Sequence, residues 1–245
     1  MLNLVIDIGN SRTKIALFNE HDLMFNVPVE NFSADHARLL RNEHPQLDRA
    51  ILSSVKPYDE ELKSFLKNNF SYFLELDDKT RLPIENLYET PETLGKDRLA
   101  AAVGANELFP DQNLLIIDAG TAVTYDLVSD KNQFLGGNIS PGLEMRYKAL
   151  NQFTGRLPLV GPSDYYQQIG RNTVEAIRAG VQNGLIFEME QTIELFNRNY
   201  QNLQIIMTGG DSYFFDKKLK YSIFVHFNLT LIGLNRILEH NAEKK

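Results

Sequence analysis

The sequence contains no cysteine among its 245 residues. This absence excludes disulfide bonds, a thiolate nucleophile and thiolate metal ligands, and it suits a reducing compartment. The five histidines are scattered among polar residues, so they do not indicate a metal centre. The N-terminal segment lacks the basic region of a signal peptide and reaches the acidic Asp7 within its first apolar run. We therefore expect a cytoplasmic protein.

Long apolar runs and an excess of positive charge are missing as well. The longest apolar stretch, Ile223 to Leu234, is interrupted by polar residues and is too short to cross a bilayer. The formal net charge is −7, from 32 acidic and 25 basic residues, so the average surface repels nucleic acid. Hydrophobic residues make up 43% of the chain and charged residues 23%, as in folded globular proteins. We expect a globular protein that binds neither membranes nor nucleic acids.

The common nucleotide-binding and hydrolase motifs are also absent. The chain has no Gly-x-x-x-x-Gly-Lys-Ser/Thr loop, no Gly-x-Gly-x-x-Gly after a strand and no Gly-x-Ser-x-Gly elbow. A nucleotide site in this chain must therefore use another kind of loop.

One pattern occurs twice: an apolar strand, an Asp-x-Gly turn and a second strand. The first copy carries Asp-Ile-Gly-Asn at 7–10, and the second carries Asp-Ala-Gly-Thr at 118–121. In each copy the spacing predicts two antiparallel strands joined by a glycine turn. The copies lie about half a chain apart, as a duplicated βββαβα domain would place them. We predict two domains, residues 1–112 and 113–245.

Apolar periodicity predicts the other elements. Further strands are expected at 50–54, 71–75, 133–140 and 203–207. Helices are expected at 33–42, 59–68, 96–108, 170–200 and 229–239, with another beginning near 141. Residues 76–94 contain two prolines and show little periodicity, which predicts a long loop. A loop of that length in a compact protein is usually functional.

The two glycine turns have the equipment to hold phosphate. Glycine lets backbone N–H groups come close to phosphate oxygens, and a carboxylate at the strand end can hold Mg²⁺ directly or through water. Ser11, Thr13 and Lys14 add hydroxyl donors and a positive charge. Two facing turns would suit phosphoryl transfer, which depends on positioning and charge neutralisation. The alternative is a pair of ordinary hairpin turns, in which Asp and Gly are common; the repetition favours phosphate binding.

The paired turns resemble those of the actin, hexokinase and heat-shock-chaperone superfamily. Within it, the sequence is similar to the type III pantothenate kinases through six segments in the same order. These segments are Asp7–Lys14, Gly95–Arg98, Asp118–Thr124, Gly136–Gly142, Gly170–Thr173 and Thr208–Gly210. Ser11 stands where that family often has threonine, which keeps the hydroxyl.

The resemblance implies an α/β fold of two similar actin-like (ribonuclease H-like) βββαβα domains that face each other across a nucleotide cleft. It implies transfer of the γ-phosphate of ATP to pantothenate, giving 4′-phosphopantothenate in the first step of coenzyme A biosynthesis. It further implies Mg²⁺ with ATP, a monovalent cation (K⁺ or NH₄⁺) and a homodimer.

The resemblance also implies roles for individual residues in ATP and cation binding. The residues expected to bind ATP are Asp7, Ile8, Gly9, Asn10, Ser11, Arg12, Thr13, Lys14 and Thr121. Asp7 would also hold the divalent metal, directly or through water. Asp118 would belong to the monovalent-cation site.

The pantothenate site is expected to include Gly95, Lys96, Asp97, Arg98 and Thr173. Tyr88, in the long loop, is a looser match to a substrate-contacting tyrosine of the family. Asp97 would be the catalytic proton acceptor for the primary hydroxyl. It lies in the first turn of a predicted helix, where the helix dipole favours the ionised form and makes it a weaker base. A loose phosphoryl-transfer transition state asks little of the base early, so this is acceptable.

Arg98 can present its planar guanidinium to the pantothenate carboxylate, a role that lysine fills less well. Plainer interpretations remain open at both positions. Asp97 could be only a helix N-terminal cap, and Arg98 only a surface ion-pair partner.

Two other functions remain as alternatives. One is an inactive regulatory protein of the same fold, against which the acidic composition and the intact Asp7, Asp97 and Asp118 argue. The other is a different small-molecule kinase of the superfamily. Such a kinase is expected to lack the Gly-x-Asp-Arg and Gly-x-Asn-Thr segments that this chain contains.

Overall fold

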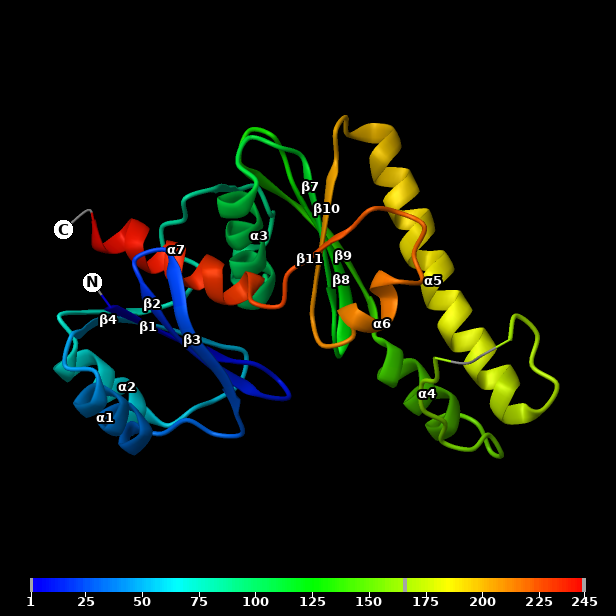
Figure 1. Ribbon diagram of the computed structural model, residues 1–245, viewed down its shortest axis with the longest axis horizontal. Coiled ribbons are helices and arrows are strands. Elements are labelled where there is room, and N and C mark those ends of the chain that lie inside the picture. Colours follow the sequence, from blue (N-terminus) through cyan, green and yellow to red (C-terminus); the bar gives the residue numbers. More distant parts are fainter. Residues whose placement is uncertain (1, 165–166, 244–245) are drawn as a thin grey trace. The chain divides into compact units, whose positions relative to one another are not determined.

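The computed structural model describes residues 2–164 and 167–243. The chain divides into two units (Figure 1). The first unit comprises Met1–Pro110, Asn132–Phe134 and Asn228–Lys245, and the second comprises Asp111–Lys131 and Leu135–Phe227. Each unit is built around one β-sheet.

The first unit contains a five-stranded sheet with the strand order β3-β2-β1-β4-β5. Its strands are β1 (Leu2–Ile8), β2 (Thr13–Asn19), β3 (Asp22–Val29), β4 (Leu47–Ser54) and β5 (Tyr72–Glu75). β1 runs antiparallel to β2 and parallel to β4, and β4 runs parallel to β5. The carboxyl ends of β1, β4 and β5 therefore lie at one edge of the sheet.

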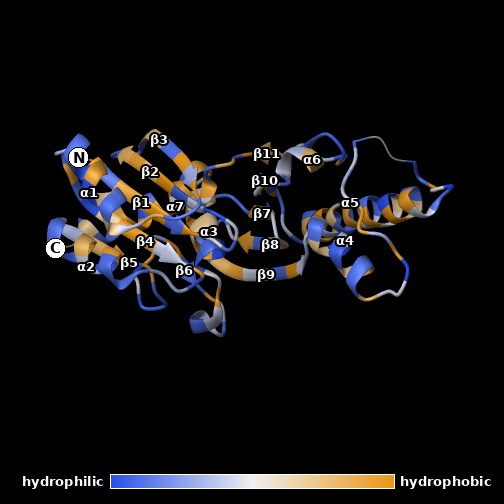
Figure 2. Cartoon of the chain, turned by 90° about the horizontal axis from the view of Figure 1, so that it is seen from below, coloured by the Kyte–Doolittle hydropathy of each residue, from blue (hydrophilic) through white to orange (hydrophobic). Residues whose placement is uncertain are grey.

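Helices cover both faces of this sheet (Figure 1). Helices α1 (Ala34–Glu43) and α2 (Glu60–Asn69) begin at Ser33 and Asp59, whose side chains accept backbone N–H groups of the first turn. Leu4, Ile6, Leu52, Leu62 and Leu66 share the core on that face. Figure 2 shows the hydrophobic residues concentrated along β1, β2 and β4.

The opposite face is covered by α3 (Lys96–Leu108) and α7 (Leu229–Ala242). The two helices cross at glycines. A Cβ on Gly104 would lie 2.1 Å from the carbonyl oxygen of Leu229, and one on Gly233 would lie 1.7 Å from that of Ala100. Larger residues at these two positions would push the helices apart.

The second unit repeats the strand order of the first. Its sheet runs β11-β10-β7-β8-β9, and β6 pairs with the first residues of β9. The strands of this sheet are β7 (Leu114–Ala119), β8 (Ala122–Val128), β9 (Gln133–Pro141), β10 (Gln204–Thr208) and β11 (Phe224–Val225). β6 (Glu85–Asn86) and its partners Gln133 and Phe134 belong to the first unit. The helices are α4 (Leu143–Gln152), α5 (Thr173–Asn199) and α6 (Ser212–Asp216). Leu115, Ile117, Leu185, Met189 and Ile193 are fully buried in its core.

The predicted helices and strands are found close to their expected bounds, and the repeated strand-turn-strand pattern is confirmed. Residues 76–94 are not wholly loop, because they contain β6 and a 3-10 helix at Pro91–Thr93. The sequence pattern also missed β3, α6 and β11. β3 is an edge strand with mostly exposed residues, so it lacks the continuous apolar run of β1.

The division into units differs from a single boundary at residues 112 and 113. The chain does change units after Pro110, but the segment from Asn228 returns to the first unit. The reason is the packing of α7 against α3, β1 and β4.

In the part of the chain that the structure describes, no helix is long and apolar enough to cross a membrane.

Candidate active site

The first Asp-x-Gly turn joins β1 to β2. Asp7 pairs with Lys14 in the ladder, and the N–H of Gly9 donates to the carbonyl of Arg12 at 3.1 Å. Asn10, Ser11 and Arg12 are exposed at the tip, whereas the Thr13 side chain is buried. The exposed backbone of residues 10–12 is therefore free to meet a phosphate.

Asp7 has a buried carboxyl group. Its residue is 8% exposed, and burial raises its pKa to about 6. The charge of Lys14 opposes this shift, and the charge of Asp97 adds to it. The structure thus brings Asp7, Lys14 and Asp97 together within the first unit. A bound cation would offset the cost of ionising Asp7, so this position fits a divalent metal held with phosphate.

Asp97 lies in the first turn of α3. Its Oδ1 accepts the N–H of Arg98 at 2.8 Å, and a Cβ on Gly95 would lie 2.6 Å from the same oxygen. Glycine at position 95 therefore makes room for this carboxylate. Gly95, not Asp97, occupies the N-cap position, and Asp97 instead accepts an N–H group from within the first turn.

Arg98 and Tyr88 lie together beside this turn. The Arg98 residue is 6% exposed, and its guanidinium carbon is 5.7 Å from the centre of the Tyr88 ring. Arg98 is therefore buried and does not lie on the surface, where the plainer interpretation placed it. Tyr88 in turn packs against Phe134, with ring centres 6.1 Å apart. The looser sequence match at Tyr88 thus falls next to the predicted substrate segment.

The second Asp-x-Gly turn, between β7 and β8, is surrounded by glycines. The N–H of Gly142 donates to the carbonyl of Thr121 at 3.1 Å, and a Cβ on Gly142 would lie 2.1 Å from the carbonyl oxygen of Gly120. Gly209 has φ +94°, and its Cβ would lie 2.4 Å from Oδ1 of Asp118. Three segments therefore meet here: residues 118–121, residues 208–210 and Gly142. These glycines do more than allow a turn, because a side chain at Gly142 or Gly209 would collide with the 118–121 segment.

A polar network fastens the end of β9 before Gly142. Arg146 donates to the carbonyl of Pro141 and to Oγ of Ser140, each at 2.8 Å, and to Oε2 of Glu188 at 2.5 Å. The hydroxyl of Tyr125 donates to Oε1 of Glu188 at 3.0 Å. Burial alone would raise the pKa of Glu188, but these donors lower it.

Thr173 is the first residue of α5 and is exposed. The side chain of Asn172 caps the helix by accepting the N–H of Glu175 at 3.0 Å. Gly170 allows a close approach, because its Cβ would lie 2.1 Å from the N atom of Ala176. The predicted residues thus fall into two sets. Asp118, Thr121 and Thr173 belong to the second unit, and the others belong to the first.

Ser53 was missed in the sequence, and Thr208, named there only as part of a motif, was not predicted to lie beside a strand-end aspartate. Ser53 on β4 is the ladder partner of Asp7, and Thr208 on β10 is the ladder partner of Asp118. Both are buried. A signal was available, because each ends an apolar run that predicts a strand, but the register between strands is not visible in the sequence.

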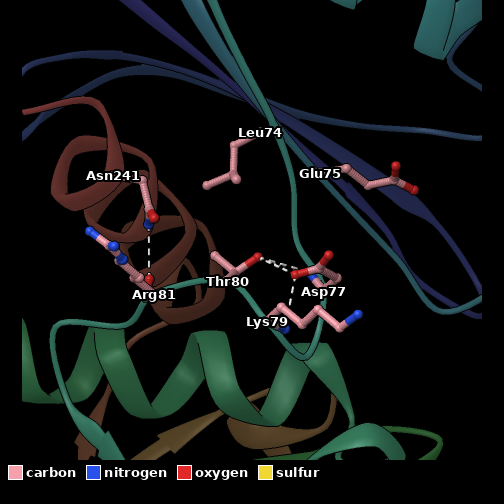
Figure 3. Close-up of a pocket in the computed structure, with 7 residues that line it drawn as sticks. All are labelled: Leu74, Glu75, Asp77, Lys79, Thr80, Arg81 and Asn241. Carbon is pink, nitrogen blue, oxygen red and sulfur yellow. Dashed lines mark hydrogen bonds between the residues drawn. The ribbon is translucent and has the colours of Figure 1, made fainter. Parts of the chain in front are cut away.

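A cavity lies beside the end of β5 (Figure 3). It has a volume of about 380 Å³ and is lined by Leu74, Glu75, Asp77, Lys79, Thr80, Arg81 and Asn241. Its loop is held locally: the Thr80 hydroxyl donates to Asp77 at 2.7 Å, and Asn241 donates to the carbonyl of Arg81 at 2.8 Å. None of the predicted site residues lines this cavity.

Among the described residues no group of three or more His, Cys, Asp or Glu side chains could hold a metal ion. A divalent ion at Asp7 would therefore take most of its ligands from phosphate oxygens and water, as Mg²⁺ does in nucleotide sites.

Solved structures show the fold to which the chain is similar. A protein from Campylobacter jejuni described as a Baf family transcriptional activator is 23% identical, with a TM-score of 0.61 over 98% of this chain and 99% of that chain. The activator of the 2-hydroxyisocaproyl-CoA dehydratase from Clostridium difficile is 10% identical, with a TM-score of 0.56 over 100% and 96%. A glucokinase from an Antarctic psychrotroph is 12% identical, with a TM-score of 0.55 over 98% and 99%. These matches confirm an actin-like ATPase fold.

Sequence comparison is more specific. The family model of type III pantothenate kinase matches residues 3–195. A type III pantothenate kinase of Bacteroides fragilis is 46% identical over 240 residues, covering 98% of each chain. Another, of Porphyromonas gingivalis, is 41% identical over 243 residues, covering 98% of this chain and 99% of the relative. The chain therefore belongs to the type III pantothenate kinase family of ATP-dependent kinases.

Proposed function

We propose that the carboxylates of Asp7 and Asp97 carry the pantothenate kinase reaction, one at the ATP phosphates and the other at the acceptor hydroxyl. The strongest support is that the charge of Asp97 acts on the carboxyl group of Asp7 within the first unit, which requires the two side chains to lie near each other. The reaction transfers the γ-phosphate of ATP to the primary hydroxyl of pantothenate and releases ADP and 4′-phosphopantothenate.

In the first unit, the turn at residues 7–14 binds the ATP phosphates. Backbone N–H groups of its exposed tip donate to phosphate oxygens, and Lys14 adds a positive charge. Asp7 holds the divalent cation that accompanies ATP, directly or through water. That cation, when bound, supplies neutralisation of charge on the phosphate oxygens.

Asp97 orients the primary hydroxyl of pantothenate and accepts its proton. The N–H of Arg98 already donates to Oδ1 of Asp97. This hydrogen bond holds one carboxylate oxygen and leaves the other to accept from substrate. Because phosphoryl transfer passes through a loose transition state, the proton leaves late and a weakly basic carboxylate is adequate.

Gly95, Lys96, Arg98 and Tyr88 bind the rest of pantothenate. The guanidinium of Arg98 suits the substrate carboxylate, since it can donate two parallel hydrogen bonds. The Tyr88 ring beside it limits the rotation of the Arg98 side chain. Burial of the guanidinium also strengthens its interaction with an anion.

In the second unit, Thr121 contacts ATP and Asp118 belongs to a site for K⁺ or NH₄⁺. Support comes from the packing of Gly142 and Gly209 against the 118–121 turn, which constrains its backbone. A rigid carboxylate among carbonyl oxygens is the kind of oxygen-rich site that suits such a cation.

We further propose a homodimer formed through α5, in which Thr173 contributes to substrate binding. The exposed face of α5 carries Gly180, Gly184, Phe187 and Leu195, and Phe187 is 64% exposed. An added Cβ on either glycine would meet no atom within 4 Å. Thr173 lies at the start of the same helix, so a partner covering this face would lie close to it. We also propose that the reaction takes place in the cytoplasm. ATP is available there, and a chain without cysteine suits a reducing compartment.

The inactive regulatory alternative has only the Campylobacter jejuni structure in its favour, and 23% identity shows the fold alone. A coupled assay of ADP release by the purified protein separates the possibilities. We expect ADP formation that requires pantothenate and is faster in potassium than in sodium buffer. Absence of pantothenate-dependent ADP formation in every cation would contradict the proposed reaction.

A further inference from the structure

The Ser53 hydroxyl is an unusual polar group beside the proposed ATP site. Ser53 is 0% exposed, and its Oγ has no hydrogen-bond partner. A buried hydroxyl without a partner carries an uncompensated desolvation cost. Such groups in folded proteins call for an explanation, and a ligand-dependent partner is one.

The ladder places this hydroxyl next to Asp7. Ser53 on β4 and Asp7 on β1 are partners in a parallel ladder, so both side chains project from the same face of the sheet. Neighbouring strands lie about 4.8 Å apart, which lets a serine hydroxyl reach a carboxylate by side-chain rotation.

The shared face is the one covered by α3 and α7. Asn3 and Asp7 point the same way because strand side chains alternate, and the Asn3 amide donates to Asn235 of α7 at 2.9 Å. Asp97 at the start of α3 acts on Asp7 from this side. The Ser53 hydroxyl therefore points toward the carboxylates of the site and away from the core around Leu62 and Leu66.

The second unit has the same arrangement. Thr208 on β10 is the parallel ladder partner of Asp118, as Ser53 is of Asp7. Thr124, on the antiparallel side of Asp118, has a buried Oγ1 without a partner. A hydroxyl residue beside the strand-end aspartate thus occurs in both halves of the repeat.

We propose that Ser53 is a positioning residue for Asp7: its hydroxyl donates to the Asp7 carboxylate when that carboxylate holds the cation of the ATP complex. An ionised carboxylate only accepts hydrogen bonds, and a hydroxyl donor fixes its orientation. Such partners of metal-binding groups contribute strongly to metal affinity. This inference rests on the proposed role of Asp7.

The arrangement gives Ser53→Ala two opposite effects. In the ligand-free protein, the substitution removes an unpaired buried hydroxyl, so the melting temperature should rise by about 2–6 °C. When ATP binding is measured by calorimetry at increasing Mg²⁺ concentrations, the Mg²⁺ concentration that gives half of the full gain in ATP affinity should rise roughly 10-fold. Ser53→Thr keeps the hydroxyl and should restore the Mg²⁺ dependence, since Thr208 occupies the equivalent position in the second unit.

Ser54→Ala is the matched control. Ser54 is the next residue, faces the other side of the sheet, and its hydroxyl donates to the carbonyl of Lys56 at 2.5 Å. It should leave the Mg²⁺ dependence unchanged and should not raise the melting temperature. An unchanged Mg²⁺ dependence in Ser53→Ala, or a lower melting temperature of its ligand-free form, would overturn the proposal.

Asp7→Asn separates this proposal from the one on which it rests. If Asp7→Asn abolishes the Mg²⁺ dependence of ATP binding and Ser53→Ala does not alter it, only the role of Ser53 is overturned. If neither substitution alters it, the role of Asp7 fails as well.

Discussion

Asp7 and Asp97 lie near enough in the first unit for the charge of Asp97 to act on the Asp7 carboxyl. Burial has the larger effect on the pKa of Asp7, Lys14 opposes it, and Asp97 adds to it. A cation and a substrate hydroxyl between the two carboxylates would offset the effect of Asp97 on the ionisation of Asp7. The end of β1 and the first turn of α3 thus bring two acidic residues near each other, although they lie far apart in the sequence.

Asp97→Asn should lower turnover by at least about 10²-fold, because an amide cannot accept the proton of the substrate hydroxyl. The affinity for ATP should change little, since Asp97 is assigned to the acceptor side. Asp35→Asn is a matched control, because Asp35 has the same place in the first turn of α1 but is exposed. Steady-state kinetics of both variants test this. Near-normal turnover in Asp97→Asn would show that the base is elsewhere.

Asp7→Asn should stabilise the ligand-free protein at neutral pH. The folded-state pKa of about 6 exceeds the ordinary value of 3.8, so the folded state binds the proton more tightly than the unfolded state. Stability is therefore lost as pH rises from about 4 to about 6 and is level above that. Removing the charge should recover at most about 3 kcal/mol of unfolding free energy at pH 7.

Denaturant unfolding of Asp7→Asn and the parent protein at pH 4 and pH 7 measures this difference. The stabilisation should be present at pH 7 and nearly absent at pH 4. Equal gains at both pH values would mean that the stabilisation does not come from the charge of Asp7.

The sequence predicted the two turns and α3 because their signals are local. An Asp-x-Gly after an apolar run marks a strand end, and the alanines of Lys96–Leu108 favour a helix of the observed length. The return of α7 to the first unit could not be predicted in this way. It depends on a backbone contact between Gly104 and Gly233, which are remote in sequence.

The candidate site shows the same division. Residues 7–14 and 95–98 are recognisable as short motifs, and the structure brings Asp7 and Asp97 together. Ser53 was not recognised, because its place beside Asp7 depends on the register between β1 and β4. The burial of Arg98 could not be predicted from the sequence either, because it depends on packing against residues such as Tyr88 that are not its sequence neighbours.

Gly209→Ala should damage the second turn. Gly209 has φ +94°, and an added Cβ would lie 2.3 Å from the carbonyl oxygen of Ala119. We expect a loss of stability of about 1–3 kcal/mol or more, with weakened ATP binding. Gly210→Ala is the matched control for folding, because its Cβ would meet nothing within 4 Å. Thermal unfolding of the two variants should differ clearly, and equal melting temperatures would contradict the close packing on Asp118.

Asp118→Asn should abolish activation by potassium while ATP affinity is retained. The amide keeps the size of the side chain but removes the charge that attracts a cation. Kinase rates measured over a potassium titration, with ATP affinity measured separately, test this prediction. Activation equal to that of the parent protein would contradict the cation assignment, and loss of ATP affinity alone would assign Asp118 to the nucleotide.

Phe187→Asp should dissociate the proposed dimer. Phe187 is 64% exposed on the uncharged face of α5, and a buried carboxylate at an interface is costly. Phe153→Asp is the matched control, because Phe153 is 81% exposed but follows α4 and not the α5 face. Light scattering should give half the parent mass for Phe187→Asp and the full mass for Phe153→Asp. If the partner's α5 lies beside Thr173, dissociation should raise the KM for pantothenate more than that for ATP. A dimer of unchanged mass in Phe187→Asp would place the interface elsewhere.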